Sequence, residues 1–375
     1  MTQSNILFIG MDVHKDSIVI SLADDDRSEI RRYGTIGGTL ADFKKTLRKL
    51  TATGKSLFFC YEAGPTGYEL YRYITAQGHQ CIVVAPSLIP KKPGDKVKTD
   101  QRDADNLTRL LRSGDLTSVY VPNEEDEAIR DLSRAREDAV IVFKQAKQRL
   151  KSFLLRHNIR FDGSANWSEK HLRWLAESVN MPFSAQKVVY QEYLNSVTET
   201  NARVKRFDKE ILFHTTQWRL FPVVNALMAL RGVRMVVAVT MIAELGDLTR
   251  FKNPKQLMCF LGLTPSEHST GERKKQGAIT KTGNQHARRV LVEAGWAYRF
   301  HAKVSKEMQK RQEDIPLNIR DIAWKAQLRL TRRFRIMANN GKPRNVIVVA
   351  MAREIAAFMW SIAQEVPIES RSKFN

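Results

Sequence analysis

Four acidic residues in the first third of the chain have the types and spacing needed to bind a metal ion. Asp12 and Glu62 each end an apolar, strand-like segment, and Asp100 and Asp103 lie three residues apart at the start of a helical one. Strand ends meet at one edge of a sheet, and helix residues three apart share a face. Carboxylates gathered in this way repel one another unless a cation lies between them. Because Mg²⁺ prefers carboxylate oxygens and can stabilise both oxygens of a displacement at phosphorus, the pattern predicts a magnesium site for phosphoryl transfer.

Each of these acids also has a simpler interpretation. Asp100 could complement the dipole of its helix, and Asp12 could be a turn residue. Asp105 competes with Asp103 as the last ligand, although its offset from Asp100 turns it to another face of the helix. The joint occurrence of all four acids on suitable elements favours the metal site.

A second group of chemically suitable residues lies far along the chain. Ser269 and Thr270 directly precede Gly271. Six cations follow this triplet, namely Arg273, Lys274, Lys275, Lys281, Arg288 and Arg289. Gly271, Gly277 and Gly283 allow the backbone to approach a ligand closely. A hydroxyl among cations and glycines suits a nucleic-acid phosphate, and the alternative is an ordinary basic surface loop with a Ser-Thr turn.

The elements expected to position the acids form an α/β layer structure over residues 1–121. Apolar, β-rich runs predict strands, while amphipathic periodicity or flanking Pro and Gly predict helices. The predicted strands are 5–13, 16–22, 29–36, 56–61 and 80–85, and the predicted helices are 39–50, 65–78 and 99–113. Three consecutive strands followed by alternating helices and strands give the element order of the ribonuclease H-like fold.

The chain changes character at Pro122. Residues 124–157 contain no Gly or Pro and place apolar side chains mostly at three- and four-residue steps, which predicts one long helix. We interpret it as a coiled-coil arm that could pair two subunits, and the alternative is a solvated helix within one subunit. Residues 181–220 predict further helix, so the arm is expected to extend over residues 122–220.

From residue 221 to residue 375 we expect a mainly helical domain. Residues 223–230 and 234–245 predict two helices joined by a turn at Gly232, a pattern similar to the helix-hairpin-helix that binds DNA phosphates through backbone amides. Arg234 occupies the place of that motif's second glycine, so packing is the alternative role for this unit. Residues 346–363 are apolar but contain Arg and Glu in the middle, which predicts a buried helix rather than a membrane span.

The composition restricts the class of partner. The chain has 375 residues and a formal net charge of +21, which solubility does not require and which favours a polyanion such as nucleic acid. Between Gly271 and Ala350 there are 19 Lys and Arg against 6 Asp and Glu, so most of the excess lies in the C-terminal part. Cys60, Cys81 and Cys259 lie in apolar stretches without metal-ligand spacing, which predicts reduced core residues of a cytoplasmic protein. The first residues lack the basic region of a signal peptide.

With both groups of residues in view, the chain resembles the IS110-family transposases. The N-terminal motifs that carry the resemblance are MDVHK at 11–15, YEAG at 61–64 and KTDQRDA at 98–104. The C-terminal motifs are GV at 232–233, AELGD at 243–247, FK at 251–252, GLTP at 262–265, STG at 269–271 and TKTGN at 280–284. The resemblance covers nearly the whole chain. It implies a RuvC-like DEDD domain at 1–121, a coiled-coil arm at 122–220 and a C-terminal transposase domain with a serine motif at 221–375.

The resemblance also implies a mechanism, because members of the family are recombinases that use both a DEDD metal site and a serine. Ser269 is the expected nucleophile on a DNA phosphodiester. Where the family often has a second serine this chain has Thr270, which is the alternative nucleophile. His268 is adjacent and could act as a base, but neighbours in a loop rarely point the same way. The acids expected to bind Mg²⁺ and activate the hydroxyl are Asp12, Glu62, Asp100 and Asp103.

The partners implied by the resemblance are nucleic acids and further copies of the chain. Donor and target DNA are expected to pair with a structured non-coding guide RNA, the bridge RNA, while dimers join into a tetramer. The cations expected to contact phosphates are Lys274, Lys275, Lys281, Arg288 and Arg289. No membrane partner is expected, and the location implied is the bacterial cytoplasm, on the nucleoid when the protein is active.

Other functions fit parts of the same pattern. One is a metal-dependent nuclease of the Holliday-junction type, in which water attacks and Ser269 is a structural residue. A covalent protein–DNA intermediate separates it from the recombinase. Another is a nucleic-acid-binding protein without chemistry, against which the intact acids and the intact serine argue. A helix-turn-helix regulator fits poorly because no operator-reading helix stands out.

Overall fold

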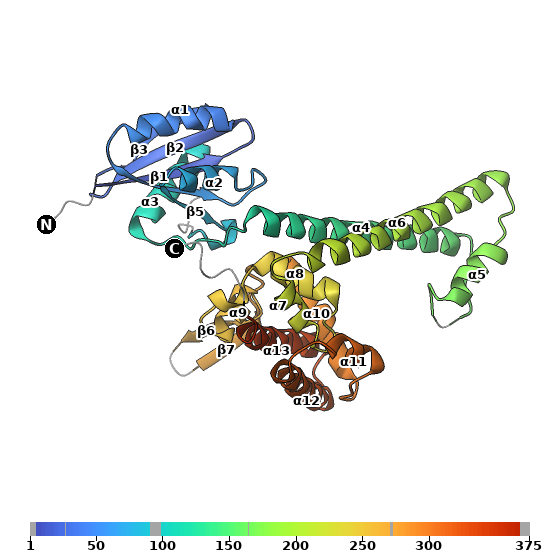
Figure 1. Cartoon of the computed structure of the whole chain (residues 1–375). Helices are drawn as coiled ribbons and strands as arrows, with labels where there is room; N and C mark the ends of the chain where they lie inside the picture. Colours follow the sequence, from blue (N-terminus) through green and yellow to red (C-terminus); the bar gives the residue numbers. More distant parts are fainter. Residues whose placement is uncertain (1–4, 27, 91–98, 164, 271–272, 368–375) are drawn as a thin grey trace. The chain divides into compact units, whose positions relative to one another are not determined.

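The computed structural model describes residues 5–26, 28–90, 99–163, 165–270 and 273–367, with the backbone alone for 268–270 and 273–275. The chain divides into two compact units, Met1–Val121 and Pro122–Asn375 (Figure 1). Each unit has its own hydrophobic core.

A five-stranded sheet is the centre of the N-terminal unit. Its strand order is β3-β2-β1-β4-β5, with β1, β2 and β3 antiparallel and β1, β4 and β5 parallel. The strands are β1 (Ile6–Val13), β2 (Ser17–Asp24), β3 (Arg31–Gly37), β4 (Ser56–Glu62) and β5 (Gln80–Val84). This is the α/β architecture and the element order predicted from the sequence.

Helices cover both faces of this sheet (Figure 1). The helices are α1 (Leu40–Thr51), α2 (Glu69–Ala76), the short η1 (Pro86–Leu88) and α3 (Asp100–Ser113). Ile9 and Met11 of β1 share a core with α1 and α2, whereas Phe8 shares one with α3. Successive strand residues point to opposite faces, so even-numbered β1 residues face α3. The prediction of a helix from residue 65 was wrong at its start, because a turn with Gly67 at a φ of +70° comes first.

Two 33-residue helices form the arm, α4 (Glu124–Arg156) and α6 (Ser184–Thr216). They run side by side in opposite directions, and α5 (Glu169–Glu177) lies near their far end (Figure 1). A separate core there includes Leu150, Leu175 and Met181. The predicted long helix is confirmed, and its packing partner is a second helix of the same chain. A coiled coil between subunits stays a prediction.

The rest of the C-terminal unit is mainly helical, as predicted. Its helices are α7 (Phe221–Leu227), α8 (Met235–Leu245), η2 (Leu248–Arg250), α9 (Pro254–Phe260), α10 (Gln285–Gly295), η3 (Trp296–Arg299), α11 (Lys306–Gln312), α12 (Leu317–Asn339) and α13 (Arg344–Gln364). Among the described residues, α13 is the one helix long and apolar enough to cross a membrane. Its Met351, Ile355 and Met359 are fully buried in the domain core, which confirms the predicted buried helix.

The turn between α7 and α8 packs against α10 of the same unit. Gly232 has a φ of +80°, and a Cβ there would lie 2.5 Å from the carbonyl oxygen of Ala294 in α10. Arg234, for which the sequence offered no role, pairs with Glu307 of α11 at 2.9 Å. The geometry therefore favours packing over phosphate contact for this turn. Cys60 and Cys81 are buried as predicted, whereas Cys259 is exposed, because it lies on the outer side of the short helix α9.

Candidate metal centre and serine hairpin

Strand register brings Asp12 and Glu62 to the same edge of the sheet. Met11 of β1 pairs with Tyr61 of β4, and each acid is the next residue along its strand. Met11 and Tyr61 are fully buried in the core that contains α1 and α2. Because side chains alternate along a strand, Asp12 and Glu62 belong to the opposite face, which α3 covers.

A close contact at Gly10 fixes α3 on that face. A Cβ at Gly10 would lie 2.5 Å from the backbone nitrogen of Thr108 and 2.6 Å from the carbonyl oxygen of Ala104, so only glycine fits. The Gly10 amide instead donates to the Thr108 hydroxyl at 3.0 Å. Thr99 caps α3 by accepting from the backbone of the third helical residue. These contacts set the first turn of α3, with its two acids, beside the end of β1.

Asp12, His14 and Asp100 form a cluster with metal-binding potential. Each offers one ligand atom, and these atoms lie within 4.8 Å of one another. His14 Nε2 is 3.2 Å from Asp12 Oδ2 and 3.7 Å from Asp100 Oδ1. The Asp12 side chain is 15% exposed and that of Asp100 is 61% exposed, so the cluster is open to a ligand.

The electrostatics of Asp12 reflect this crowding. Burial raises the pKa of Asp12, and the nearby carboxylates of Asp100 and Asp103 raise it further. The charge and hydrogen bond of His14 oppose the rise without cancelling it. A carboxylate whose ionisation is disfavoured by two others is stabilised in its charged form by a cation.

The structure separates Asp103 from its competitor on the same helix. Asp103 lies close enough to Asp12 to influence its ionisation. Asp105 instead accepts from the Ser21 hydroxyl at 2.5 Å and from the Gln101 amide at 2.7 Å. The hydrogen bonds of Asp105 therefore join α3 to β2. His14, not assigned a ligand role from the sequence, follows Asp12 by two residues, a strand-face spacing that could have revealed it.

The donor set fits a divalent cation that prefers oxygen ligands. Three carboxylates gather at this edge with one imidazole. Carboxylates are good ligands for both Mg²⁺ and Mn²⁺, whereas an imidazole is a better ligand for Mn²⁺ than for Mg²⁺. Glu62 ends β4 at the same edge of the sheet and takes part in contacts of its own.

Ser269 lies on a β-hairpin in the C-terminal unit. The strands β6 (Pro265–Thr270) and β7 (Arg273–Ile279) pair antiparallel, with Ser269 opposite Lys274 and His268 opposite Lys275. The expected loop is thus partly wrong, because its cations at 273–275 belong to a strand. The sequences of β6 and β7 do not alternate between apolar and polar residues, which is the pattern that usually predicts a strand. The two strands pair through backbone hydrogen bonds, which a sequence pattern does not reveal. Gly271 lies outside the described residues.

Two glycines close the base of this hairpin. A Cβ at Gly262 would lie 2.1 Å from the carbonyl oxygen of Thr282, and one at Gly283 would lie 2.0 Å from that of Phe260. Both glycines have positive φ, of +63° and +90°. The two chain segments that enter and leave the hairpin therefore touch backbone to backbone.

Arg288 and Arg289, expected at nucleic-acid phosphates, have partners within the protein. Arg288 donates to the carbonyl oxygen of Leu261 at 2.9 Å, which braces the hairpin base. Arg289 donates to Glu137 of the arm at 2.7 Å and to Glu293 at 2.9 Å. Contact of either with phosphate stays a prediction, as it does for Lys274, Lys275 and Lys281.

A buried acid joins the arm to the hairpin's domain. The Glu244 side chain of α8 is 1% exposed and accepts two hydrogen bonds from Arg134 of α4, at 2.7 and 2.8 Å. It also accepts from Asn284 at 2.6 Å, and the Asn284 side chain caps α10 through the amide of Ala287. Burial alone would raise the pKa of Glu244, but the Arg134 and Asn284 bonds outweigh it and lower that pKa. The AELGD and TKTGN motifs thus meet in the hydrogen bond from Asn284 to Glu244, beside the ion pair of Glu244 with Arg134.

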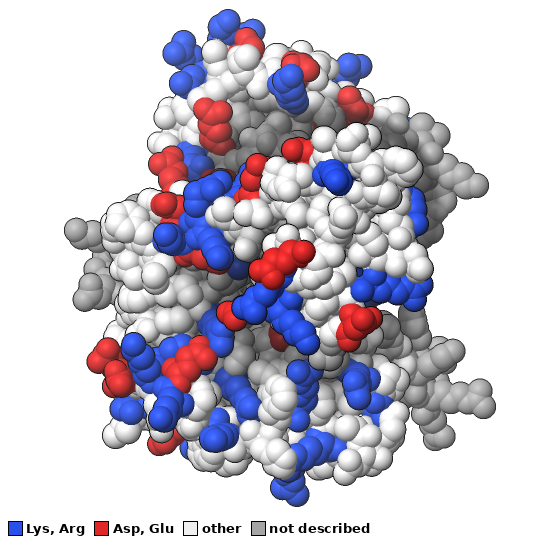
Figure 2. Space-filling model, turned by 90° about the vertical axis from the view of Figure 1, so that its right-hand side faces the viewer, with Lys and Arg blue, Asp and Glu red and all other residues white. Residues whose placement is uncertain are grey.

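The surface carries the charge that the composition predicted. Figure 2 shows Lys and Arg side chains gathered on the lower part of the molecule, at the level of α12 in Figure 1. Some acids intervene, and α12 itself pairs Arg329 with Glu354 of α13. A surface of this kind suits a polyanionic partner.

Comparisons with known proteins agree with these features. Residues 9–159 match the family model DEDD_Tnp_IS110, described as "Transposase", and residues 224–311 match the "Transposase IS116/IS110/IS902 family". The chain is 45% identical to "Putative transposase y4qE" of Sinorhizobium fredii, over 96% of this chain and 88% of that protein. It is 33% identical to "Transposase for insertion sequence element IS1533" of Leptospira borgpetersenii, over 88% of this chain and 96% of that protein.

A DEDD domain implies that a divalent metal is used. The chain therefore belongs to the IS110 family of insertion-sequence transposases, enzymes that cut and rejoin DNA.

Proposed function

We propose that this transposase cuts and rejoins DNA through Ser269, with magnesium held by Asp12, Glu62, Asp100 and Asp103. The observation that carries the proposal is the crowded cluster at the start of α3, where Asp12 ionises against two neighbouring carboxylates. The serine lies in the other unit, so the reaction requires its hairpin to meet a metal centre in the same or another subunit.

The proposed step is a transesterification at phosphorus. The Ser269 oxygen forms a bond to the phosphorus of a DNA phosphodiester while one bridging P–O bond of the strand breaks. The serine proton passes to a base, and the leaving oxygen takes up a proton and becomes a free hydroxyl. Because one phosphoester replaces another, a hydroxyl of a second strand can later attack the phosphoserine and release the enzyme. No outside energy source is needed.

The acids have defined tasks in this scheme. When bound, the metal lowers the pKa of a hydroxyl and stabilises negative charge on the phosphorus oxygens. Asp12 and Asp100 provide ligand oxygens from β1 and α3, and Asp103 adds a third charge at the same place. His14 is within hydrogen-bond reach of Asp12, where it can orient that carboxylate or exchange a proton with it.

The proposal extends to the partners. Donor and target DNA are selected by pairing with a non-coding guide RNA, and Lys274, Lys275 and Lys281 contact the phosphates near the hairpin. Dimers of the chain join into a tetramer that brings serines and metal centres together. The protein acts in the bacterial cytoplasm, on the nucleoid. The net charge of +21 supports a nucleic-acid complex of this size without distinguishing RNA from DNA.

The test is a search for DNA covalently bound to the protein. Purified wild type with its co-purifying RNA, Mg²⁺ and labelled junction DNA is expected to give a protein–DNA band that survives denaturation. Ser269→Ala should abolish this band, and Thr270→Ala is the matched control that should keep it. Asp12→Asn should abolish both the band and DNA cleavage.

Two outcomes contradict the proposal. A band lost in Thr270→Ala and kept in Ser269→Ala would move the nucleophile to the threonine. Metal-dependent cleavage without any covalent band, unchanged in Ser269→Ala, would leave a nuclease of the Holliday-junction type that uses water.

A further inference from the structure

The arm is strongly asymmetric in charge along α4. Its first part carries seven acids, Glu124, Glu125, Asp126, Glu127, Asp131, Glu137 and Asp138, against Arg130, Arg134 and Arg136. From residue 139 to residue 161 there is no acid at all. The cations of that stretch are Lys144, Lys147, Arg149, Lys151, Arg156 and Arg160. Ion pairs within the C-terminal unit account for some of these acids, since Arg289 pairs with Glu137 and Arg219 pairs with Asp126. Among the described residues, no ion pair holds a cation of the basic part.

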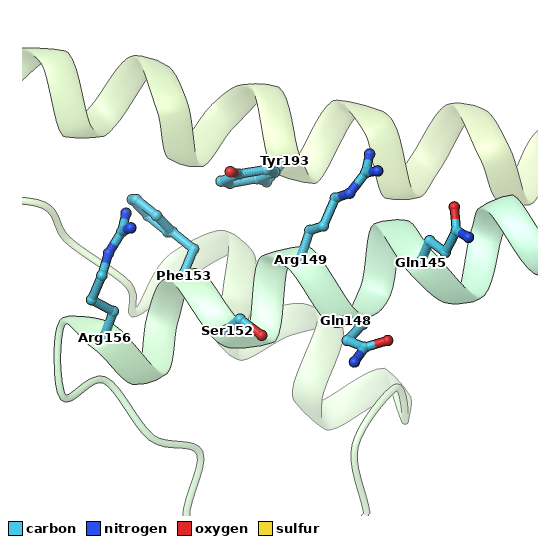
Figure 3. Close-up of a pocket in the computed structure, with 7 residues that line it drawn as sticks. All are labelled: Gln145, Gln148, Arg149, Ser152, Phe153, Arg156 and Tyr193. Carbon is cyan, nitrogen blue, oxygen red and sulfur yellow. The ribbon is translucent and has the colours of Figure 1, made fainter.

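A groove of about 540 Å³ lies on this basic part, between α4 and α6. It is lined by Gln145, Gln148, Arg149, Ser152, Phe153, Arg156 and Tyr193. Figure 3 shows Arg149 and Phe153 rising from α4 toward α6, on either side of the Tyr193 ring. The volume falls within the range of about 300–1,000 Å³ typical of small-ligand sites.

The groove combines two features that bind unpaired nucleotides. The rings of Phe153 and Tyr193 lie 5.3 Å apart at 53°, and Tyr193 is only half-buried, so its ring is available to a planar ligand. Two guanidinium groups flank the rings, and the Arg156 guanidinium lies 5.5 Å from the Phe153 ring. Among the described residues neither Arg149 nor Arg156 is paired with a carboxylate. Stacking on aromatic rings beside cations is the way proteins bind single strands.

The remaining lining residues favour RNA over DNA. The side chains of Gln145, Gln148, Ser152 and Tyr193 can each donate and accept a hydrogen bond. A ribose 2′-hydroxyl is likewise both donor and acceptor, and it is the group by which proteins distinguish RNA. An intact duplex stacks its bases internally and offers none of them to the Tyr193 ring.

We propose that this groove on the arm binds an unpaired segment of RNA, with a base stacked on Tyr193 and phosphates held by Arg149 and Arg156. The proposal rests on the RNA partner in the proposed function and gives that partner a place on the chain. It concerns binding alone, so its success or failure does not depend on Ser269 or on the metal.

The sharpest test compares two charge removals on one helix. Arg149 faces the groove, whereas Lys151, two residues later, lies about 200° around the helix and near His171 of α5. Binding of a short, unstructured, labelled oligoribonucleotide to the full-length protein is measured by fluorescence anisotropy over a range of salt. Arg149→Gln should weaken binding about tenfold and lower the salt slope by about 0.7. Lys151→Gln should change the affinity by less than about twofold.

Substitutions of the ring provide the second arm of the test. Tyr193→Phe keeps the stacking surface and should bind within a few fold of wild type, while Tyr193→Ala should lose about tenfold or more. Thermal melting of each variant separates a lost contact from a disturbed arm. If Tyr193→Ala melts early, the Arg149 and Lys151 pair still decides the matter, because both residues are exposed.

Several results would overturn the assignment. Equal weakening by Arg149→Gln and Lys151→Gln would mean that the strand senses only the general charge of the arm. DNA of the same sequence bound as tightly as RNA would remove the role of the 2′-hydroxyl. A change of oligomeric mass in Arg149→Gln, measured by sedimentation without RNA, would make the groove a contact between copies of the chain. Failure of wild type to bind RNA, together with intact DNA cleavage, would reject the RNA partner itself and leave the serine chemistry standing.

Discussion

Replacing Asp12 by Asn is expected to stabilise the metal-free protein while it destroys metal binding. The carboxylate oxygens of Asp12 and Asp100 lie within 4.8 Å of each other. Two charges at that separation repel by about 0.9 kcal/mol at the dielectric of water and by about 3.5 kcal/mol at an effective value near 20. Because the Asp100 side chain is 61% exposed, solvent screening favours the low end, about 1 kcal/mol. Asn keeps the size and polarity of Asp12 and removes this repulsion.

The pH dependence has a definite sign. The folded state raises the pKa of Asp12 through burial and through Asp100 and Asp103, so it binds a proton more readily than the unfolded chain. Stability of the metal-free wild type should therefore fall as pH rises from about 3.8 through the raised pKa. Asp12→Asn lacks this step, and its advantage over wild type should appear only above that interval.

The assay is urea denaturation with chelator and with Mg²⁺ or Mn²⁺ added. At a metal concentration one hundred times Kd the wild type should gain about 2.7 kcal/mol, and Asp12→Asn should gain almost nothing. Asp16→Asn removes a nearby exposed carboxylate outside the cluster and should behave like wild type. The reasoning fails if Asp12→Asn is the less stable protein in chelator, or if metal stabilises both proteins equally.

Two further predictions concern the elements that position the site. Gly10→Ala should cost about 1–3 kcal/mol and weaken metal binding, because its Cβ would meet the backbone of Thr108 and push α3 away; an unchanged metal titration would contradict this. Glu244→Gln should cost about 1.5–3 kcal/mol by breaking the ion pair between the buried Glu244 carboxylate and the partly exposed Arg134. Because the folded state lowers the pKa of Glu244, its contribution is full above about 4.5 and is lost as pH falls through the lower folded value. Urea titrations between neutral and acid pH should show wild type and Glu244→Gln converging in acid, and parallel curves would refute the assignment.

The gathering of acids at one edge of the sheet was largely predictable because it depends on local patterns, whereas metal binding there stays a prediction. Apolar runs defined the strands that carry Asp12 and Glu62 near their ends, and a three-residue spacing placed Asp100 and Asp103 on one helix face. The face on which α3 lies was not predictable, since it depends on the close approach at Gly10, which a sequence pattern does not encode. His14 was not predicted to be a ligand, although residues two apart on a strand point to the same face, as Asp12 and His14 would.

The C-terminal site was harder to predict because its contacts are long-range. Polar strands β6 and β7 have no apolar alternation, so a loop was the natural interpretation. Arg288 and Arg289 belong to a basic run, yet their partners at Leu261 and Glu137 lie far from them in the sequence. The pairing of α4 with α6 was equally invisible, because an amphipathic helix does not reveal whether its partner belongs to the same chain.

The backbone contact at the base of the serine hairpin has a consequence for reactivity. Gly262 and Gly283 leave no space between the two segments, and Arg288 bridges to Leu261 beside them. A nucleophile attached to such a base explores a smaller volume than one on an open loop, which raises its effective molarity toward a phosphate placed within reach. In the proposed serine mechanism, much of the entropy of aligning Ser269 would therefore be lost when the protein folds, before any DNA is present. Residues without a reactive group would then help to set how often an encounter leads to attack.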